Sequence, residues 1–454
     1  MKKITARAII CLCLAGILSL GTLLFVGKFL VNGGDWASFP GNRHLYSDGV
    51  LKNGRILDRN GNLLLGVDDG KWAYNSNVNV RKATLHAVGM PQGLIGTGAV
   101  TRFANKLTGY NLITGAKPIL PGGRDLYLTL DAEVCKTAYQ ALNGNKGAVG
   151  VYNYKTGEII CMVSSPTFDP QNPPKIEEGD DKYEGAYINR LLSATFIPGS
   201  TFKLITAAAA LDQIPNIEQQ TFQCTGSTEI NGKQITCPSA HGTLTLEQAL
   251  NVSCNCTFGQ LADKLGSETL EKYAERSGLT KSYSINGIHT AVSTFDFNTG
   301  DDWELAWSGI GQGKDLVNPC AMMVYAGAIA NGGDAASPQI ISRTAFLKGV
   351  RTSIYVNHYT GKVLEPETAD ALAEMMRSDV INNYGQNRFP GLSIGAKSGT
   401  AQSDHSEKDN AWFVGFLQDD EHPLAFVVLV EGGGSGSKVA GKVANTVLQA
   451  VVKQ

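Results

Sequence analysis

The chain lacks a strong excess of charge of either sign: 39 lysines and arginines nearly balance 41 aspartates and glutamates, for a formal net charge of -2. Beyond Arg7 it also lacks any block of basic residues. A basic patch is the electrostatic requirement for binding nucleic acid, so we expect no nucleic-acid partner. The chain has no internal repeat and no low-complexity tract, and this argues against a solenoid or a largely disordered protein.

The nine cysteines lack the spacing of a metal site, because no Cys-x-x-Cys pair and no His-x-x-x-His companion accompanies them. We therefore expect no metal and no cofactor. Cys11 and Cys13 fall in an apolar N-terminal run, and the odd number that remains leaves at least one thiol free. Cys224 and Cys237 bracket a stretch with the composition of a hairpin, so they are the best candidates for a disulfide.

What the chain does have at its start is an uncharged run over residues 8–27, preceded by Lys2, Lys3 and Arg7. A helix of about 20 residues spans the hydrocarbon core of a bilayer. A cleaved signal peptide is the alternative, but it ends at an Ala-x-Ala-like site, which residues 23–34 lack. We expect a single-pass anchor with a cytoplasmic N-terminus and the rest of the chain outside, because basic residues stay inside.

The length of 454 residues exceeds the size at which single cores stop growing, so more than one domain is expected. After the anchor (1–34), residues 35–143 form a small module with an Asn60-Gly61 turn between two strands. Residues 144–454 begin with two apolar strands, continue with helical patterns and end with three strands and a helix. This order predicts an α+β domain whose antiparallel sheet is covered by helices and joined to an all-helical cluster.

The first of three short strings that carry candidate chemistry is Ser200-Thr201-Phe202-Lys203. Ser200 opens an apolar helix, where unpaired N–H groups and the helix dipole favour negative charge. Lys203 lies one turn further on the same face. A lysine acts as a base only when burial or a neighbouring cation lowers its pKa, and Lys397 is a candidate for that cation. Alone, the string more often marks a helix cap with a surface lysine.

The second string, Ser253-Cys254-Asn255, falls between two helical patterns and is therefore predicted to be a loop. A serine hydroxyl can relay a proton, and an asparagine amide can hold a substrate carbonyl. By itself the string is equally well explained as a capping loop.

The third string, Lys397-Ser398-Gly399-Thr400, has apolar neighbours and is predicted to be a strand. Its lysine and serine can receive a substrate carboxylate, and Gly399 lets a ligand approach the backbone closely. The N–H of Thr400 can form an oxyanion hole with that of Ser200. A lone Lys-Ser-Gly is usually an exposed turn, so the argument depends on the three strings occurring together.

In their order and spacing the three strings resemble the penicillin-binding proteins, and more narrowly a class B transpeptidase. The resemblance covers nearly the whole chain, and the short first module looks like the reduced pedestal of elongation-type enzymes. Further matching segments are Arg55-Ile56-Leu57-Asp58-Arg59-Asn60-Gly61, Asn189-Arg190, Gly311-Gln312-Gly313, Ala330-Asn331-Gly332-Gly333 and Asp409-Asn410-Ala411-Trp412-Phe413-Val414-Gly415.

The resemblance implies a peptidoglycan D,D-transpeptidase in which Ser200 attacks the D-Ala-D-Ala carbonyl of a stem peptide and is acylated by β-lactams. It also implies a partner, a membrane glycosyltransferase of the SEDS family. The other roles that it implies are Lys203 as general base, Ser253 and Asn255 for steering proton and substrate, and Lys397, Ser398, Gly399 and Thr400 for the carboxylate and the oxyanion hole.

Three alternatives remain. A D,D-carboxypeptidase would share every catalytic residue and pass the acyl group to water. A class D β-lactamase resembles Ser-x-Val at the second string, where this chain has Asn255. The third is a non-hydrolytic sensor or scaffold that only binds β-lactams, although intact Lys203, Ser253 and Asn255 argue against a purely structural role. Two departures from the family pattern are Ser398, where threonine is commoner, and Cys254, which we expect to point away from the site.

Overall fold

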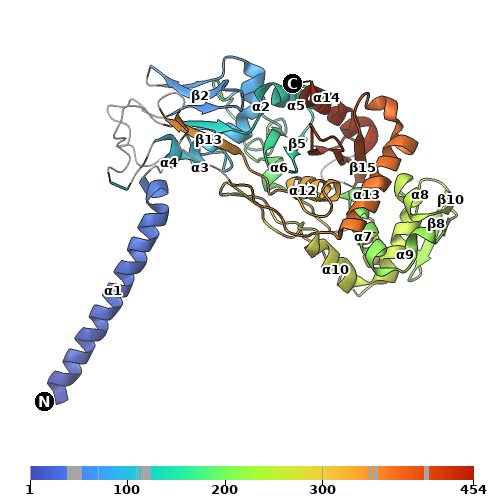
Figure 1. Ribbon diagram of the computed structural model, residues 1–454, viewed down its shortest axis with the longest axis horizontal. Helices are drawn as coiled ribbons and strands as arrows, with labels where there is room; N and C mark the ends of the chain where they lie inside the picture. The colour runs from blue at the N-terminus through green and yellow to red at the C-terminus, as the bar shows by residue number, and fades with distance from the viewer. Residues whose placement is uncertain are drawn as a thin grey trace.

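The computed structural model describes residues 2–37, 54–69, 71–108, 110, 112–113, 124–298, 300–346, 350–351, 356–402 and 408–453. Parts of the predicted first module, residues 38–53 and 114–123, lie outside the described residues. Helix α1 (Lys2–Ala37) projects away from the rest of the molecule (Figure 1). It is long and apolar enough to cross a membrane and none of its apolar window is buried, so it fits the predicted anchor, although it continues beyond Lys28.

A six-stranded sheet forms the core of the N-terminal module, with the order β14-β13-β4-β1-β2-β3. Its predicted hairpin is confirmed: Asp58 Oδ1 accepts the N–H groups of Asn60 and Asn62 at 2.9 and 2.7 Å, and Gly61 has a φ of +86°. The strands are β1 (Ile56–Leu57), β2 (Leu63–Asp68), β3 (Lys71–Tyr74), β4 (Asp125–Leu128), β13 (Ile341–Phe346) and β14 (Val350–Arg351). The module also contains helices α2 (Val78–Val88), α3 (Ala99–Arg102) and α4 (Ala104–Leu107).

Two of these strands, β13 and β14, come from the far side of the predicted boundary at residue 143. β13 pairs antiparallel with β4, with Thr344 opposite Leu126. The chain therefore leaves the C-terminal module, adds two strands to the N-terminal sheet and returns. The predicted boundary at residue 143 therefore does not assign every strand to the module in which it lies.

A five-stranded antiparallel sheet forms the core of the second module, with the order β15-β16-β17-β5-β6. Its strands bury almost every residue because both faces are covered, so they read as continuous apolar runs and not as alternating patterns. The strands are β5 (Gly147–Asn153), β6 (Ile159–Ser165), β15 (Ile394–Ala401), β16 (Asn410–Leu417) and β17 (Leu424–Val430).

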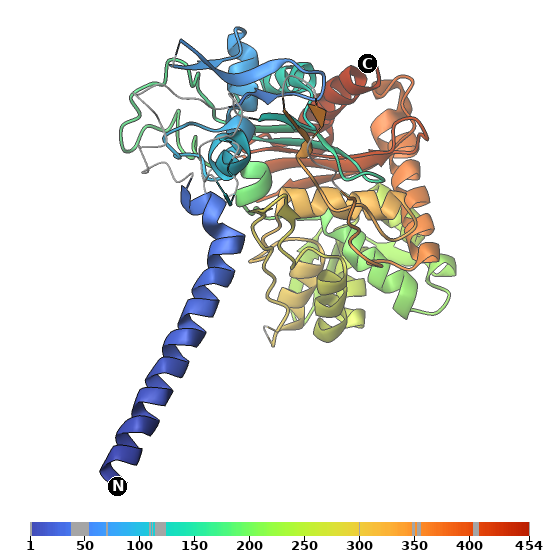
Figure 2. The same ribbon diagram turned by 60° about the vertical axis from the view of Figure 1, so that its left-hand side comes forward.

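Helices cover both faces of this sheet (Figures 1 and 2). Helix α5 (Ala132–Leu142) and the closing helix α14 (Gly441–Val452) pack against each other and against the sheet. Helix α12 (Pro319–Ala330) packs on β16 and β17, and it is apolar on all sides because it is buried. The predicted α+β fold, with helices over an antiparallel sheet, is thus confirmed.

Below the sheet in Figure 2 lies a helical cluster with small hairpins. Its helices are α7 (Lys203–Gln213), α8 (Leu246–Asn251), α9 (Asn255–Leu265), α10 (Ser267–Arg276), α11 (Asp302–Gly309) and α13 (Pro366–Asp379). Its strand pairs are β7 (Phe222–Cys224) with β10 (Gly242–Leu244), β8 (Ser227–Ile230) with β9 (Lys233–Thr236), and β11 (Ser284–Ile285) with β12 (Ile288–His289). The short helix α6 (Arg190–Ser193) instead packs on β5, β6 and α12.

Candidate active site

Ser200 lies in a 3-10 turn, Gly199–Thr201, that leads into helix α7. The Thr201 hydroxyl donates to the Pro198 carbonyl at 2.8 Å and closes this turn. Gly199 has a φ of +54°, and a Cβ on it would stand 2.6 Å from the carbonyl oxygen of Thr400. Only glycine therefore lets the turn lie directly against strand β15, and this contact brings Ser200 beside the third string.

Lys203 joins the first string to the second. Its side chain is fully buried, and its Nζ donates to the Ser253 carbonyl oxygen at 2.7 Å, to Ser253 Oγ at 3.2 Å and to Asn255 Oδ1 at 2.7 Å. Burial and, to a smaller extent, the positive charge of Lys397 together lower the pKa of Lys203 to about 7. A large fraction of the amine is therefore neutral at pH 7 and able to accept a proton.

The second string lies at the predicted connection between two helices, α8 and α9, and its last residue already begins α9. Cys254 is the N-cap of α9 and Asn255 is its first residue, while Ser253 adopts the left-handed region with a φ of +53°. This conformation is uncommon for a residue other than glycine. It turns the chain sharply between α8 and α9 and aims the Ser253 and Asn255 side chains together at Lys203.

Strand β15 is an edge strand, so its outer backbone groups face the site. The N–H of Ser398 points away from β16, because it donates to the hydroxyl of Tyr384 at 2.8 Å. Alternate residues of an antiparallel strand direct their N–H groups to the same side, so that of Thr400 also points away from β16. The carbonyl of Thr400 faces Gly199 on this side, and the Thr400 N–H and Ser200 therefore share one wall.

Lys397 lies under the site and has a partner that the sequence did not reveal. Its Nζ is 3.6 Å from Asp379 Oδ2, and both side chains are fully buried. Tyr384, whose hydroxyl is 2.8 Å from Asp379 Oδ2 and 2.9 Å from Ser398 Oγ, links this pair to the third string. Burial lowers the pKa of Lys397 and raises that of Asp379, while their mutual attraction opposes both changes.

Asp379 offered one weak signal in the sequence. It ends a helical pattern, where the macrodipole disfavours a carboxylate, so an acidic residue at that position suggests a specific partner. Tyr384 offered none. The structure brings together all eight predicted site residues: Ser200, Lys203, Ser253, Asn255, Lys397, Ser398, Gly399 and Thr400.

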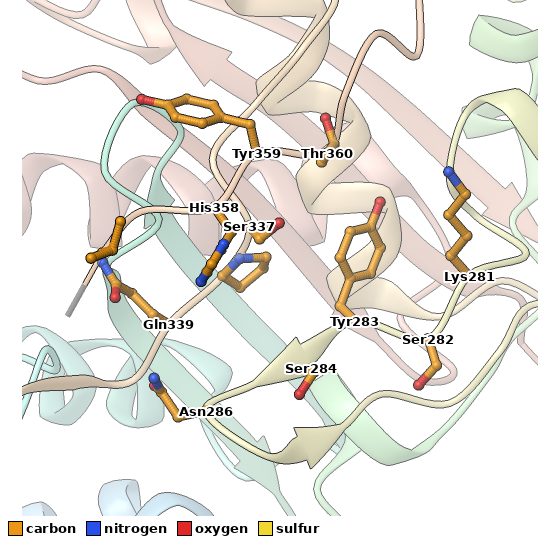
Figure 3. Close-up of a pocket in the computed structure, with 12 residues that line it drawn as sticks. Lys281, Ser282, Tyr283, Ser284, Asn286, Ser337, Gln339, His358, Tyr359 and Thr360 are labelled. Carbon is orange, nitrogen blue, oxygen red and sulfur yellow. The ribbon is translucent and has the colours of Figure 1, made fainter.

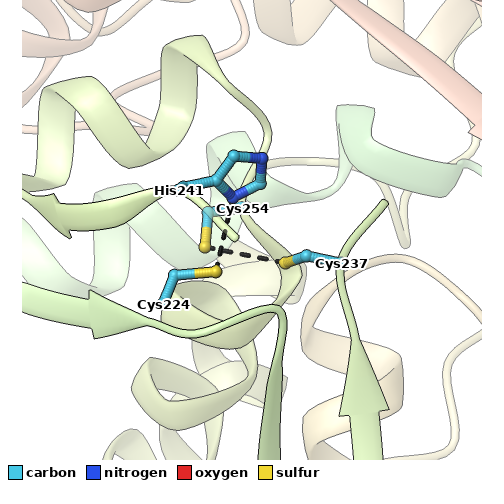
Figure 4. A group of neighbouring side chains, drawn as sticks. All are labelled: Cys224, Cys237, His241 and Cys254. Atoms are coloured by element: carbon cyan, nitrogen blue, oxygen red, sulfur yellow. Dashed lines mark hydrogen bonds between the residues drawn. The ribbon is translucent and has the colours of Figure 1, made fainter. Parts of the chain in front are cut away.

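The predicted disulfide between Cys224 and Cys237 is wrong for this structure, where both thiols are free. The hairpin that they bracket is present as β8 and β9. Each sulfur has another neighbour: Cys224 Sγ lies 3.4 Å from His241 Nδ1, and Cys237 Sγ lies 3.8 Å from Cys254 Sγ (Figure 4). Cys254 therefore belongs to a cysteine cluster. This agrees with the expectation that its side chain points away from the active site.

A pocket of about 900 Å³ lies elsewhere, between the β11–β12 hairpin and the segments on either side of β13 (Figure 3). Tyr283, Asn286, Gln339 and His358 are among its lining residues. It contains no residue of the three strings, so it is separate from the candidate active site.

Comparisons with known proteins agree with this geometry. Residues 147–449 match the family model of the penicillin-binding protein transpeptidase domain. The chain is 28% identical over 364 residues to the peptidoglycan D,D-transpeptidase PbpA of Mycobacterium tuberculosis, with 73% of each protein covered. The D,D-transpeptidase domain of a peptidoglycan glycosyltransferase from Eggerthella lenta superposes with a TM-score of 0.75 at 25% identity, covering 88% of this chain and 98% of that one.

A third comparison is with penicillin-binding protein A of M. tuberculosis, solved as a penicillin G acyl-enzyme, which has a TM-score of 0.74 at 24% identity and covers 88% of this chain and 99% of that one. At that identity it shows the fold alone. The family match extends over most of the chain, so the protein belongs to the penicillin-binding protein transpeptidase family. Within that family it is a serine transpeptidase of class B, with an apolar N-terminal helix ahead of its catalytic domain.

Proposed function

We propose that this protein cross-links peptidoglycan by forming a serine acyl-enzyme with D-Ala-D-Ala stem peptides. The observation that carries the proposal is the environment of Lys203: its buried amine contacts Ser253 and Asn255 and sits one helical turn from Ser200. A buried lysine with a lowered pKa is a competent general base. Its position beside a serine at a helix start matches the arrangement of an activated nucleophile.

In the proposed acylation, the neutral amine of Lys203 takes the proton of Ser200 Oγ as that oxygen attacks the penultimate D-alanine carbonyl. The N–H groups of Ser200 and Thr400 stabilise the oxyanion. The C–N bond to the terminal D-alanine then breaks, and the proton passes through Ser253 Oγ to the departing amine. The side chains of Lys397 and Ser398 make the site favourable for the terminal carboxylate.

In the second half-reaction the amine of a neighbouring stem peptide attacks the ester, and Ser200 regains its proton. A β-lactam would enter the first half-reaction as a mimic of the dipeptide and remain as the acyl-enzyme. If water replaced the amine, the same site would act as a D,D-carboxypeptidase, which is the second candidate. The transpeptidase is the preferred candidate because the relative PbpA of Mycobacterium tuberculosis is a peptidoglycan D,D-transpeptidase.

We further propose that the N-terminus is cytoplasmic and that the catalytic domain lies outside the cell membrane. The basic residues Lys2, Lys3 and Arg7 precede the span, and basic flanks stay on the cytoplasmic side. The anchor and the six-stranded sheet would then be the surfaces that meet a membrane glycosyltransferase of the SEDS family.

The test is labelling with a fluorescent penicillin, followed by turnover of a stem pentapeptide with and without an amine acceptor. We expect a long-lived label on the wild type and none on Ser200→Ala. Release of D-alanine that depends on the acceptor, with formation of a cross-linked product, supports the transpeptidase. Release of D-alanine without any cross-linked product supports the carboxypeptidase, rapid turnover of the drug supports a β-lactamase, and absence of label on the wild type refutes the acyl-enzyme.

A further inference from the structure

A cluster of one histidine and three cysteines lies directly behind the second string. The side chains of Cys224, Cys237, His241 and Cys254 converge (Figure 4), and their four possible ligand atoms all lie within 4.8 Å of one another. They come from four separate places: the end of β7, the residue after β9, the turn before β10 and the N-cap of α9. Cys254 is the central residue of the Ser-x-Asn string, so the cluster is covalently continuous with the proposed active site.

Two distances within the cluster match those of a tetrahedral metal site. Around a zinc ion with Zn–S of about 2.3 Å and Zn–N of about 2.1 Å, two sulfurs stand about 3.8 Å apart and a sulfur and a nitrogen about 3.6 Å apart. Here the sulfurs of Cys237 and Cys254 are 3.8 Å apart, and Cys224 Sγ is 3.4 Å from His241 Nδ1. A disulfide needs about 2.05 Å, so the sulfur–sulfur contact is too long for a disulfide, and both contacts have the length expected of ligands around a common ion.

Backbone groups around the cluster are arranged for thiolates. Cys237 Sγ accepts the N–H of Asn255 at 3.1 Å and that of Cys256 at 3.4 Å, and Cys254 Sγ accepts the N–H of Thr257 at 3.5 Å. All three donors lie in the first turn of α9, where the helix dipole favours negative charge. N–H donors to ligand sulfurs are the usual outer contacts of a metal–thiolate site.

The fold around the cluster also needs a cross-link. Residues 222–244 consist of two two-stranded ribbons, β7–β10 and β8–β9, and such ribbons are marginally stable alone. Their strands bury few apolar side chains: Cys224, Ile230, Ile235 and Leu244. A metal bound to β7, β9 and α9 together would fasten this excursion to the catalytic helices, as metals do in small domains with little core.

The geometry points to a structural zinc site formed by Cys224, Cys237, His241 and Cys254. Three thiolates and a neutral imidazole are a ligand set that zinc prefers in closed sites. This inference departs from the sequence expectation of no metal. A second part of it rests on the proposed function: by holding Cys254, the metal fixes the left-handed Ser253 and the side chain of Asn255 against Lys203.

The fifth cysteine of the region supplies a matched control. Cys256 Sγ lies 3.5 Å from Cys237 Sγ and 3.9 Å from the carbonyl oxygen of Ile235, and it is outside the set of four. Replacing it with serine removes a neighbouring thiol of the same kind without removing an assigned ligand.

The first measurement is the metal content of the full chain, purified in detergent under reducing conditions and analysed by mass spectrometry of elements. We expect one zinc per wild-type chain, at least a tenfold lower content in Cys224→Ser and in His241→Ala, and unchanged content in Cys256→Ser. Because a ligand variant can lose metal by unfolding, the wild type is also stripped with a chelator and reloaded with Co²⁺. Sulfur-to-cobalt charge-transfer bands with tetrahedral ligand-field bands are expected.

The site would be overturned if the purified wild type contained no zinc and gave no such bands with Co²⁺. A disulfide between Cys237 and Cys254 in the reduced preparation would overturn it as well. Loss of zinc from Cys256→Ser as complete as from Cys224→Ser would overturn the assigned ligand set. The positioning role is tested by labelling with fluorescent penicillin: removal of zinc should slow labelling at least tenfold, and added zinc should restore it. Full-rate labelling of the stripped protein refutes that role, whereas absence of label from zinc-loaded protein refutes the acyl-enzyme instead.

Discussion

The lowered pKa of Lys203 makes the pH dependence of acylation a direct test of its role. With the ordinary pKa of 10.5, about 3 amines in 10,000 are neutral at pH 7, whereas with a pKa of about 7 about half are neutral. The environment therefore raises the concentration of the base roughly 1,000-fold. Because only the neutral amine accepts a proton, the acylation rate should increase tenfold per pH unit below about 7 and level off above it.

The assay is the second-order rate constant for labelling by a fluorescent penicillin between pH 5 and pH 9, with thermal unfolding measured at each pH to show that the protein stays folded. The rate at pH 5 should be about 1% of the plateau. Lys203→Arg should be inactive throughout, because arginine stays protonated. The double variant Lys397→Met with Asp379→Asn removes a positive neighbour, so its midpoint should move to higher pH. A rate that stays flat from pH 5 to pH 9 would refute Lys203 as the base.

Two further predictions concern the walls of the site. Asp379→Asn leaves Lys397 with an uncompensated buried charge, so the free energy of unfolding should fall by about 3 kcal/mol, measured by denaturant titration; a change below 0.5 kcal/mol would contradict a stabilising ion pair. Gly199→Ala places a Cβ 2.6 Å from the Thr400 carbonyl oxygen, and penicillin labelling should fall at least tenfold. Its control is Gly144→Ala, which shares a positive φ but has open space around it and should cost only about 1 kcal/mol without slowing labelling.

The sequence predicted several individual helices and strands well, because their signals are local. The strand at residues 394–402, which contains Lys397, appears as β15, and the N-cap Asp131 starts α5 by accepting two backbone N–H groups. The return of β13 to the N-terminal sheet could not be predicted in this way. Its partner β4 lies more than 200 residues earlier, and nothing in a strand's own pattern identifies which edge it will join.

The same distinction between local spacing and tertiary packing applies to the residues of the site. Ser200 and Lys203 are one helical turn apart, so their proximity follows from the sequence alone. The pairing of Lys397 with Asp379 and the gathering of cysteines with His241 depend on tertiary packing. The sequence holds a trace of the cluster in Cys237-x-x-x-His241, but this is neither a Cys-x-x-Cys nor a His-x-x-x-His spacing, and spacing along the chain does not show which four residues the fold brings together.

The crossing of β13 into the first sheet has a practical consequence for producing the catalytic domain by itself. A chain that started at residue 144 would lack β4, which pairs with Ile341, Arg343, Thr344 and Ala345 of β13. Strand β13 would then have an unpaired edge. Such a chain would also lack α5, which packs against β6. Exposed strand edges recruit other chains and cause aggregation. A soluble form is therefore better obtained by removing α1 and beginning between it and Gly54, which keeps β1, β4 and α5 in place.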